Sequence, residues 1–419
     1  MNLKKEIIQV AKNAKSAASF LANLETSEKN RILEEMAGSL EENKANILKA
    51  NKKDIAVARA TKLSSAFIDR LTLNEKRITD MVTCLLDVAK LSDPVGTEIK
   101  SWQAPSGLQI HKVRVPIGVI AIIYESRPNV TADCLGLTFK SGNSVILRGG
   151  SEALNSNIAI FKAINEVVKK NKLPKGVINF ITTKDRRAID VLLKLNDYID
   201  LVIPRGGESL IKKVVSLSRI PVIKHYKGIC HVYVDDYADL NMAENICFNA
   251  KVQRPGVCNA MESMLVHRDV AARFLPGMLK KFKEAGVEIR GCPFTQKIGK
   301  EGIKKAVDKD YRTEYADLIL AVKVLDSLDE AVKHINEYGS HHSDSIVTDD
   351  ENNAKEFLKR VDSACVYCNA STRFTDGYQF GMGAEIGIST DKLHARGPMA
   401  LEELTSYKYA VWGNGQVRA

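Results

Sequence analysis

The segment with the clearest chemical character is Gln253-Arg-Pro-Gly-Val-Cys258-Asn259. It lies between an expected helix over 239–252 and an expected strand over 264–266, so Cys258 is on a constrained loop and not on a core face. A thiolate nucleophile needs partial exposure and a positive environment, and Arg254 is four residues away. Most cysteines are small buried apolar residues, and only the loop context favours a catalytic thiol here.

Three further loops carry an arginine and suit anionic ligands: 124–129, 148–152 and 204–207. The segment 148–152 follows an expected strand and opens an expected helix. Its backbone N–H groups could hold a phosphate, and Arg148 could pair with a second one. An ordinary strand-to-helix turn has the same pattern. No G-x-G-x-x-G fingerprint follows the first expected strand.

Two histidine- and cysteine-containing segments raise the question of a metal. In His341-His342-Ser-Asp344 the adjacent histidines are expected to diverge, and no third ligand stands at a defined spacing. The only CxxC, Cys365-Val-Tyr-Cys368, is in a strand-like run without a second pair. We therefore expect no metal site.

The elements that must position these residues alternate along the chain. Residues up to about 93 have helical periodicity, and 101–115 form an expected hairpin with Pro105 and Gly107 at its turn. From residue 116 short apolar segments alternate with helical ones, at first up to 223 and then in a second unit over about 230–369. This pattern is typical of parallel sheets covered by helices on both faces. In the first of the two units, ligands are expected at the carboxyl ends of the strands.

Composition sets the class of protein. The chain has 419 residues, 45% of them hydrophobic and 27% charged, which predicts two or three globular domains and excludes a largely disordered chain. Apolar runs stay far below the roughly 20 residues that cross a bilayer, and we expect a cytoplasmic protein with reduced cysteines. The net charge of +10 is scattered, so small anionic substrates are favoured over nucleic acid or a membrane surface.

Twelve short motifs, in order along the whole chain, resemble one known family. They are VRVPIGVI at 113–120, YESRPNV at 124–130, KSGN at 140–143, LRGGSE at 147–152, IPRGG at 203–207, GICHVYVD at 228–235, QRPGVCN at 253–259, GSHHSD at 339–344, NASTRFTDG at 369–377, GAEIGIS at 383–389, LHARGP at 393–398 and GNGQVR at 413–418. The family is that of the glutamate-5-semialdehyde dehydrogenases, or gamma-glutamyl phosphate reductases, within the aldehyde dehydrogenase superfamily.

The resemblance implies an α/β fold of the aldehyde dehydrogenase type, with two Rossmann-like parallel-sheet domains and a small β arm for oligomerisation. It places an NADPH-binding domain at 1–98 and 116–229 and a catalytic domain at 230–370. A glycine-rich segment over 371–398 would return to the active-site cleft. The arm would comprise 99–115 and 399–419, which predicts a homo-oligomer, either a dimer or a tetramer.

The activity implied by the resemblance is the NADPH-dependent reduction of L-glutamyl 5-phosphate to the semialdehyde, with phosphate release, in proline biosynthesis. Cys258 falls on the family's nucleophile and would form a thioacyl enzyme. Its backbone N–H and the amide of Asn129 are the expected oxyanion donors. The expected NADP-binding residues are Arg148, Gly149, Gly150, Ser151, Glu152, Arg205, Gly206, Gly207 and Glu314. The expected substrate-binding residues are Ser126, Arg127, Asn259, Arg373 and Arg396.

One stretch departs from the aldehyde dehydrogenases that make acids. Those enzymes place a general-base Glu near the position of His225, whereas this chain has Lys224-His-Tyr-Lys-Gly228 without a carboxylate. The departure fits a reductive reaction, in which water must not cleave the thioester, and it leaves His225 without an assigned role.

Two other functions remain open from the sequence: an aldehyde dehydrogenase or acyl-thioester reductase with another substrate, and a basic binding protein that keeps the fold. Because an acyl phosphate next to a free amine tends to cyclise, glutamate 5-kinase is the expected transient partner.

Overall fold

The computed structural model describes residues 3–418, apart from the side chain of Ala66. The chain forms two compact units: one comprises the residues up to 224, 381–387 and those from 399 on, and the other comprises 225–380 and 388–398. The domain roles expected from the sequence stay predictions. Within 3–418, no helix is both long and apolar enough to cross a membrane.

The first unit is built on a four-stranded parallel sheet in the order β5-β4-β3-β6. The strands are β3 (Val119–Tyr124), β4 (Ser144–Gly149), β5 (Ile178–Phe180) and β6 (Leu201–Arg205). Every residue of β3 and β4 is buried, as in a sheet covered on both faces. At the end of the alternating stretch, Val222 makes a single parallel bridge with Val202 of β6 and no further strand.

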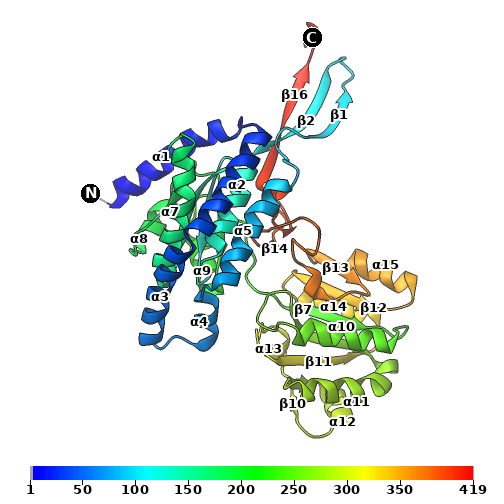
Figure 1. Ribbon diagram of the computed structural model, residues 1–419. Coiled ribbons are helices and arrows are strands. Elements are labelled where there is room, and N and C mark those ends of the chain that lie inside the picture. The colour runs from blue at the N-terminus through cyan, green and yellow to red at the C-terminus, as the bar shows by residue number, and fades with distance from the viewer. Residues whose placement is uncertain (1–2, 419) are drawn as a thin grey trace. The chain divides into compact units, whose positions relative to one another are not determined.

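Nine helices in the described part of this unit surround the sheet (Figure 1). They are α1 (Leu3–Leu21), α2 (Thr26–Glu42), α3 (Lys44–Ala60), α4 (Ser65–Leu71), α5 (Glu75–Lys90), α6 (Val130–Lys140), α7 (Leu154–Lys170), α8 (Arg187–Leu192) and α9 (Glu208–Leu217). Apolar residues of α1, α8 and α9 form one core cluster with Val119, Ala121 and Ile123 of β3. Helices α2 and α3 pack against α7.

An antiparallel arm projects from the first unit (Figure 1). The expected hairpin is β1 (Glu98–Gln103) and β2 (Gln109–Pro116), and β16 (Thr405–Trp412) pairs with β2 along its whole length. Its side chains Trp102, Tyr407, Tyr409 and Trp412 are exposed. The small β arm expected from the sequence is therefore confirmed.

The second unit contains a seven-stranded parallel sheet in the order β10-β9-β11-β8-β7-β12-β13. The strands are β7 (Cys230–Val234), β8 (Met261–His267), β9 (Glu288–Gly291), β10 (Ile303–Lys305), β11 (Ile319–Leu325), β12 (Ser343–Val347) and β13 (Cys365–Cys368). Two short strands, β14 (Ile388–Ser389) and β15 (Gly397–Pro398), form a separate ribbon.

Helices cover both faces of this sheet, and alternation along β7 assigns the faces. The helices are α10 (Leu240–Val252), α11 (Arg268–Glu284), α12 (Pro293–Gly299), α13 (Asp308–Tyr311), α14 (Leu328–Tyr338) and α15 (Glu351–Arg360). Val232 and Val234 pack with α10 and α11, while Tyr233 packs with α14 and α15. Both units thus have the doubly covered parallel sheets that the sequence predicts.

Candidate active site

The candidate site lies in the second unit, at the amino ends of four adjacent strands. Cys258 precedes β8, the segment 225–228 precedes β7, His342 precedes β12, and Glu314 lies in the loop before β11. These strands are neighbours in the order β11-β8-β7-β12 and run parallel. Parallel strands bring their amino ends to one edge of the sheet, so residues far apart in the sequence meet there.

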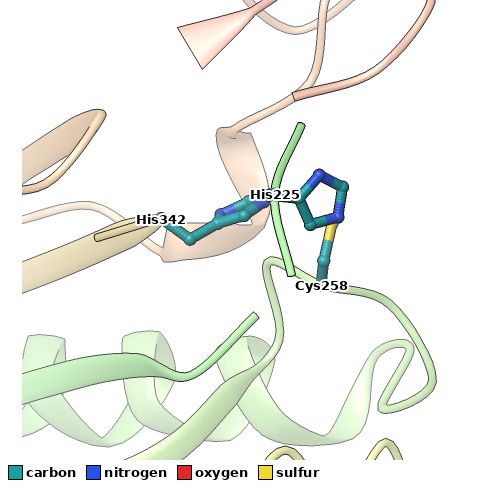
Figure 2. A group of neighbouring side chains, drawn as sticks. All are labelled: His225, Cys258 and His342. Carbon is teal, nitrogen blue, oxygen red and sulfur yellow. The ribbon is translucent and has the colours of Figure 1, made fainter. Parts of the chain in front are cut away.

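Cys258 lies between two histidines. One ligand-type atom from each of Cys258, His225 and His342 is within 4.8 Å of the other two. The two imidazole rings meet edge to face, with centroids 5.5 Å apart. Figure 2 shows the Cys258 sulfur pointing at the ring of His225, while the His342 side chain reaches in from the start of β12. The thiol is half-buried and His342 is fully buried.

Each imidazole is held through its Nδ1 atom. His225 Nδ1 is 2.8 Å from the carbonyl oxygen of Ile388, an acceptor, so this nitrogen carries a proton. His342 Nδ1 is 2.8 Å from the hydroxyl of Ser343, which is 2.6 Å from the hydroxyl of Thr375. These contacts orient both rings, so that the Nε2 atoms are the ring nitrogens that face the Cys258 sulfur.

The electrostatic setting favours the thiolate. Burial by itself raises the pKa of the Cys258 thiol, but the positive charge of His342 and a hydrogen bond with His225 outweigh it. The pKa consequently lies well below the ordinary thiol value. A depressed pKa and partial exposure distinguish a reactive cysteine from a structural one. By contrast, burial raises the pKa of the neighbouring Cys230 thiol far above its usual range.

The backbone around Cys258 is packed tightly. A Cβ atom at Gly228 would be 1.9 Å from the Cys258 carbonyl oxygen, so only glycine fits at this position. The same carbonyl accepts a hydrogen bond from the Sγ of Cys230 at 3.2 Å. Gly228, just before β7, and Cys230, its first residue, therefore support the loop that carries the nucleophile.

A buried ion pair joins the two ends of that loop. Lys251 Nζ in the last turn of α10 is 2.7 Å from Glu262 Oε2 in β8, and both side chains are fully buried. The other carboxylate oxygen, Oε1, accepts the N–H of Ala316 at 3.0 Å. The pair therefore holds both the Cys258 loop and the loop that contains Glu314.

Glu314 is within electrostatic reach of the thiol. Burial raises the pKa of the Glu314 carboxyl, and the charge of Cys258 raises it further, while the N–H of Gly228 donates to it and opposes both. The role of this residue in binding NADP stays a prediction.

Asn259 and Arg373 form one polar cluster beside the Cys258 loop. Asn259 Oδ1 accepts from the Arg373 guanidinium, and its Nδ2 donates to the Thr375 carbonyl at 2.9 Å. Arg373 Nε donates to Gln253 Oε1 at 2.8 Å. The pKa of the Arg373 guanidinium is lowered, first by burial and then by the positive charge of Arg254. The second cause means that two positive charges lie near each other.

Arg373 also lines a pocket of about 240 Å³ together with Asn249, Gln253, Phe374, Asp376 and Gln379. Arg396 lies elsewhere in the unit. Its guanidinium donates to the carboxylate and the carbonyl of Asp362, at 2.8 and 3.0 Å. Two of its donors are therefore taken by the protein itself. Substrate binding by Asn259, Arg373 and Arg396 stays a prediction.

In the first unit, the loops after β3, β4 and β6 hold one another through two carboxylates. Glu152 Oε1 accepts the N–H of Ser126 at 2.9 Å, and Glu125 Oε2 accepts the N–H of Gly207 at 2.9 Å. A Cβ atom at Gly206 would be 2.3 Å from Glu125 Oε2, so the glycine admits the carboxylate.

The helix that follows 148–152 is capped by Asp54 of α3, which accepts from the N–H groups of Asn155 and Ser156. Phosphate binding by the N–H groups of 148–152 themselves stays a prediction. Asp54 Oδ2 accepts from the N–H and the hydroxyl of Ser156 at 2.7 and 2.6 Å, and Oδ1 accepts from the Asn155 side chain at 2.7 Å. A buried carboxylate therefore already caps α7.

Arg148 is nevertheless suited to an anion. Its guanidinium is buried and donates to the Gly149 carbonyl at 2.9 Å, while its Nε has no hydrogen-bond partner. Burial lowers the pKa of this group, and the charge of Glu152 opposes that effect. A buried donor without a partner is costly unless a ligand satisfies it.

The remaining expected residues of the first unit lie on the same loops. Asn129 precedes α6, and its Nδ2 donates to Asp133 at 3.1 Å. Ser126 has a positive φ of 53°, and the N–H of Arg127 donates to the Glu125 carbonyl at 2.8 Å. Arg205 ends β6, and Gly150 and Ser151 follow β4. The functions expected for these residues stay predictions.

The sequence did not indicate that His225 and His342 converge on Cys258. The expectation that His341 and His342 diverge holds, since His341 contacts the Asp362 carbonyl while His342 points to the thiol. What was missing is the order of the strands. In a parallel sheet, residues just before neighbouring strands become neighbours in space, and this is the signal that could have found the pair.

Comparisons with known proteins agree with this architecture. A sequence model described as the aldehyde dehydrogenase family matches residues 2–297. The gamma-glutamyl phosphate reductase of Thermodesulfovibrio yellowstonii is 56% identical over 418 residues and that of Clostridium acetobutylicum 57%, each with full coverage of both chains. The crystal structure of the gamma-glutamyl phosphate reductase of Thermotoga maritima is 48% identical, has a TM-score of 0.96, and is matched over 99% of this chain and 100% of that one. The chain therefore belongs to the aldehyde dehydrogenase family and, within it, to the gamma-glutamyl phosphate reductases, which are oxidoreductases.

Proposed function

We propose that this chain reduces L-glutamyl 5-phosphate to L-glutamate 5-semialdehyde with NADPH and releases phosphate, the second step of proline biosynthesis in the cytoplasm. The names of its full-length relatives support the substrate class. The observation that carries the mechanism is the half-buried Cys258 thiol between His225 and His342, with its depressed pKa.

The first chemical step uses the protein's own groups. The Cys258 thiolate attacks the acyl carbon, and the carbon–oxygen bond to the phosphate breaks, with phosphate taking the electron pair. Because phosphate is a good leaving group, the substrate needs little activation. What must be activated is the thiol, which has to be held as a thiolate. His225 and His342 do this by holding positive charge next to the sulfur. The same two charges stabilise the thiolate when the aldehyde leaves.

The residues present fit a phosphorylated nicotinamide cofactor. The buried Arg148, with an Nε that has no hydrogen-bond partner, suits the 2′-phosphate, because a guanidinium matches phosphate geometry. Gly149, Gly150, Ser151, Glu152, Arg205, Gly206, Gly207 and Glu314 complete the proposed set. When bound, NADPH supplies the hydride that converts the thioester to the aldehyde. Asn129 and the Cys258 N–H are the proposed oxyanion donors.

Substrate anions require cationic partners. Arg373 is the best-supported one in the second unit, because it lines a pocket, lies next to the Cys258 loop and has Arg254 close to it. Arg127, Ser126, Asn259 and Arg396 are the other proposed contacts. Arg396 ranks last because Asp362 already accepts from its guanidinium.

The reverse reaction tests the proposal. NADPH formation is followed from NADP, glutamate semialdehyde and phosphate, with the wild type beside Cys258→Ala. We expect phosphate-dependent NADPH formation that disappears in the variant. NADPH formation without phosphate would mean that water resolves the thioester, and the hydrolytic aldehyde dehydrogenase function would replace the one proposed.

Assembly is the second part of the proposal. The exposed Trp102, Tyr407, Tyr409 and Trp412 make the arm an apolar surface, which suits contact with a second copy of the chain. Light scattering should give a dimer or tetramer for the wild type and a smaller species for the double variant Tyr409→Asp, Trp412→Asp.

The proposal also includes a transient contact with glutamate 5-kinase. In an assay that couples the two enzymes, such a contact should make the lag before NADPH oxidation shorter than free diffusion of the intermediate predicts.

A further inference from the structure

The three side chains around the candidate nucleophile are also a set of metal ligands. Thiolate and imidazole are the donors that Zn²⁺ prefers in proteins. His225, Cys258 and His342 each offer one such atom, and these atoms lie within 4.8 Å of one another. The donors come from three separate segments at the amino edge of one sheet, so the fold itself assembles them.

The separations are close to those of a tetrahedral zinc site. Zinc bonds of about 2.3 Å to sulfur and about 2.0 Å to nitrogen put neighbouring ligand atoms roughly 3.3–3.6 Å apart. Since the present separations are at most 4.8 Å, side-chain rotations that shorten them by up to about 1.5 Å are sufficient. The Cys258 residue is only half-buried, so solvent water would supply the fourth ligand.

The outer contacts prepare both imidazoles for coordination. The Ile388 carbonyl accepts the Nδ1 proton of His225, so Nε2 is the nitrogen that coordinates once its own proton is released. His342 Nδ1 contacts Ser343, while its Nε2 is fully buried and has no hydrogen-bond partner. A buried nitrogen without a partner is unusual, and a metal ion would satisfy it. This atom is the independent observation that indicates a ligand.

We propose that His225, Cys258 and His342 bind one Zn²⁺ ion, and that this ion reversibly inhibits the enzyme. Coordination releases to solvent the proton of the thiol or, where the sulfur is already a thiolate, the protons of the coordinating imidazole nitrogens, and it occupies the sulfur lone pair that would attack an acyl carbon. Metal binding and nucleophilic attack therefore exclude each other. The inference goes beyond the proposed function, since it requires neither the substrate nor the cofactor.

Calorimetric titration of the reduced, full-length protein with Zn²⁺ alone tests the site. We expect one equivalent to bind to the wild type, and His342→Gln and Cys258→Ser to weaken binding more than about 100-fold, since loss of even an outer-shell partner costs about 10–100-fold. The matched control is His341→Gln, which changes the adjacent histidine that contacts Asp362 instead. The control should bind zinc like the wild type, and circular dichroism checks that each variant is folded.

Two further readouts identify the ligands directly. Co²⁺ bound in place of zinc should give the absorption of tetrahedral, thiolate-ligated cobalt, and this absorption should be absent in Cys258→Ser. Zinc should also slow the alkylation of Cys258 by iodoacetamide, and a chelator should restore the rate. Absence of binding at millimolar zinc, binding that survives in folded Cys258→Ser, or equal losses in His341→Gln and His342→Gln would each overturn the proposal. An enzyme that is active but fails these tests would leave the proposed function intact.

Discussion

The buried pair Lys251–Glu262 offers a quantitative test of how the nucleophile loop is held. Both side chains are fully buried, their charged atoms are 2.7 Å apart, and the pair spans the loop with Cys258. Replacing Lys251 with Met preserves most of the volume but leaves Glu262 without its positive partner. Removing one member of a buried pair typically costs about 3–5 kcal/mol.

The size of the effect depends on pH. Burial raises the pKa of Glu262 to about 7, while the charge and the hydrogen bond of Lys251 lower it, so Lys251→Met raises it further. An acid whose pKa is higher in the folded state contributes stability below its ordinary pKa of 4.5, and that stability is lost as the pH rises through the folded value. Each pH unit between 4.5 and the folded pKa costs about 1.36 kcal/mol. At pH 8 this amounts to about 3.4 kcal/mol in the wild type and at most about 5 kcal/mol in the variant, so the pH-dependent part of the difference is at most about 1.4 kcal/mol.

Differential scanning calorimetry at pH 5 and pH 8 measures this. At pH 8 we expect the unfolding temperature of Lys251→Met to fall by about 6–20 °C, at about 2–4 °C per kcal/mol for a unit of this size. At pH 5, where Glu262 is protonated in both proteins, the loss should be smaller by up to about 3–5 °C. Lys251→Met with Glu262→Gln should recover most of the stability, because the amide still accepts the N–H of Ala316.

The matched control is Lys281→Met. Lys281 and Glu244 form a pair with the same 2.7 Å separation between helices of the same unit, but both side chains are partly exposed. Exposed pairs contribute about 0–1 kcal/mol. Equal losses in the two Lys variants, or a loss in Lys251→Met that does not grow between pH 5 and pH 8, would refute the reasoning.

Three shorter predictions concern the sites. His342→Gln removes positive charge beside the thiol, so the pH profile of Cys258 alkylation should shift upward, while His341→Gln should leave it unchanged. Gly228→Ala places a Cβ atom on the Cys258 carbonyl, so activity should fall sharply, as steady-state assays at saturating substrate would show. Asp54→Ala removes the buried cap of α7 and should lower the free energy of unfolding by about 1–3 kcal/mol in urea titrations; an unchanged midpoint would mean that water replaces the carboxylate.

Local signals predicted most of the elements. Uniformly apolar segments such as 118–123 indicated strands covered on both faces, because such a run has no polar side to expose. The start of α14 is also local, because the hydroxyl of Ser327 accepts the N–H of Glu330 three residues later. The hairpin turn at Pro105 and Gly107 was equally local, and Gly107 has a positive φ of 83°.

The groups around the thiol depended on information that is not local. Cys258 was identified from its own loop, because Pro255 and Gly256 and a nearby arginine are visible in seven residues. His225 and His342 are 117 positions apart in the numbering of the chain and meet only because β7 and β12 are neighbours. The capping of α7 by Asp54 is similar, since a side chain about 100 residues earlier in the chain accepts the first N–H groups of that helix.

By itself the sequence determined the class of fold, the family and the identity of the candidate nucleophile, because apolar periodicity, loop chemistry and ordered motifs are all properties of short segments. Only the tertiary structure decided which strands are adjacent, and therefore that two imidazoles depress the pKa of the thiol and that the site is at the amino edge of the second sheet. The physical reason is that strand order depends on packing across the whole unit, whereas the electrostatics of a thiol depend on whatever that packing brings within a few ångströms.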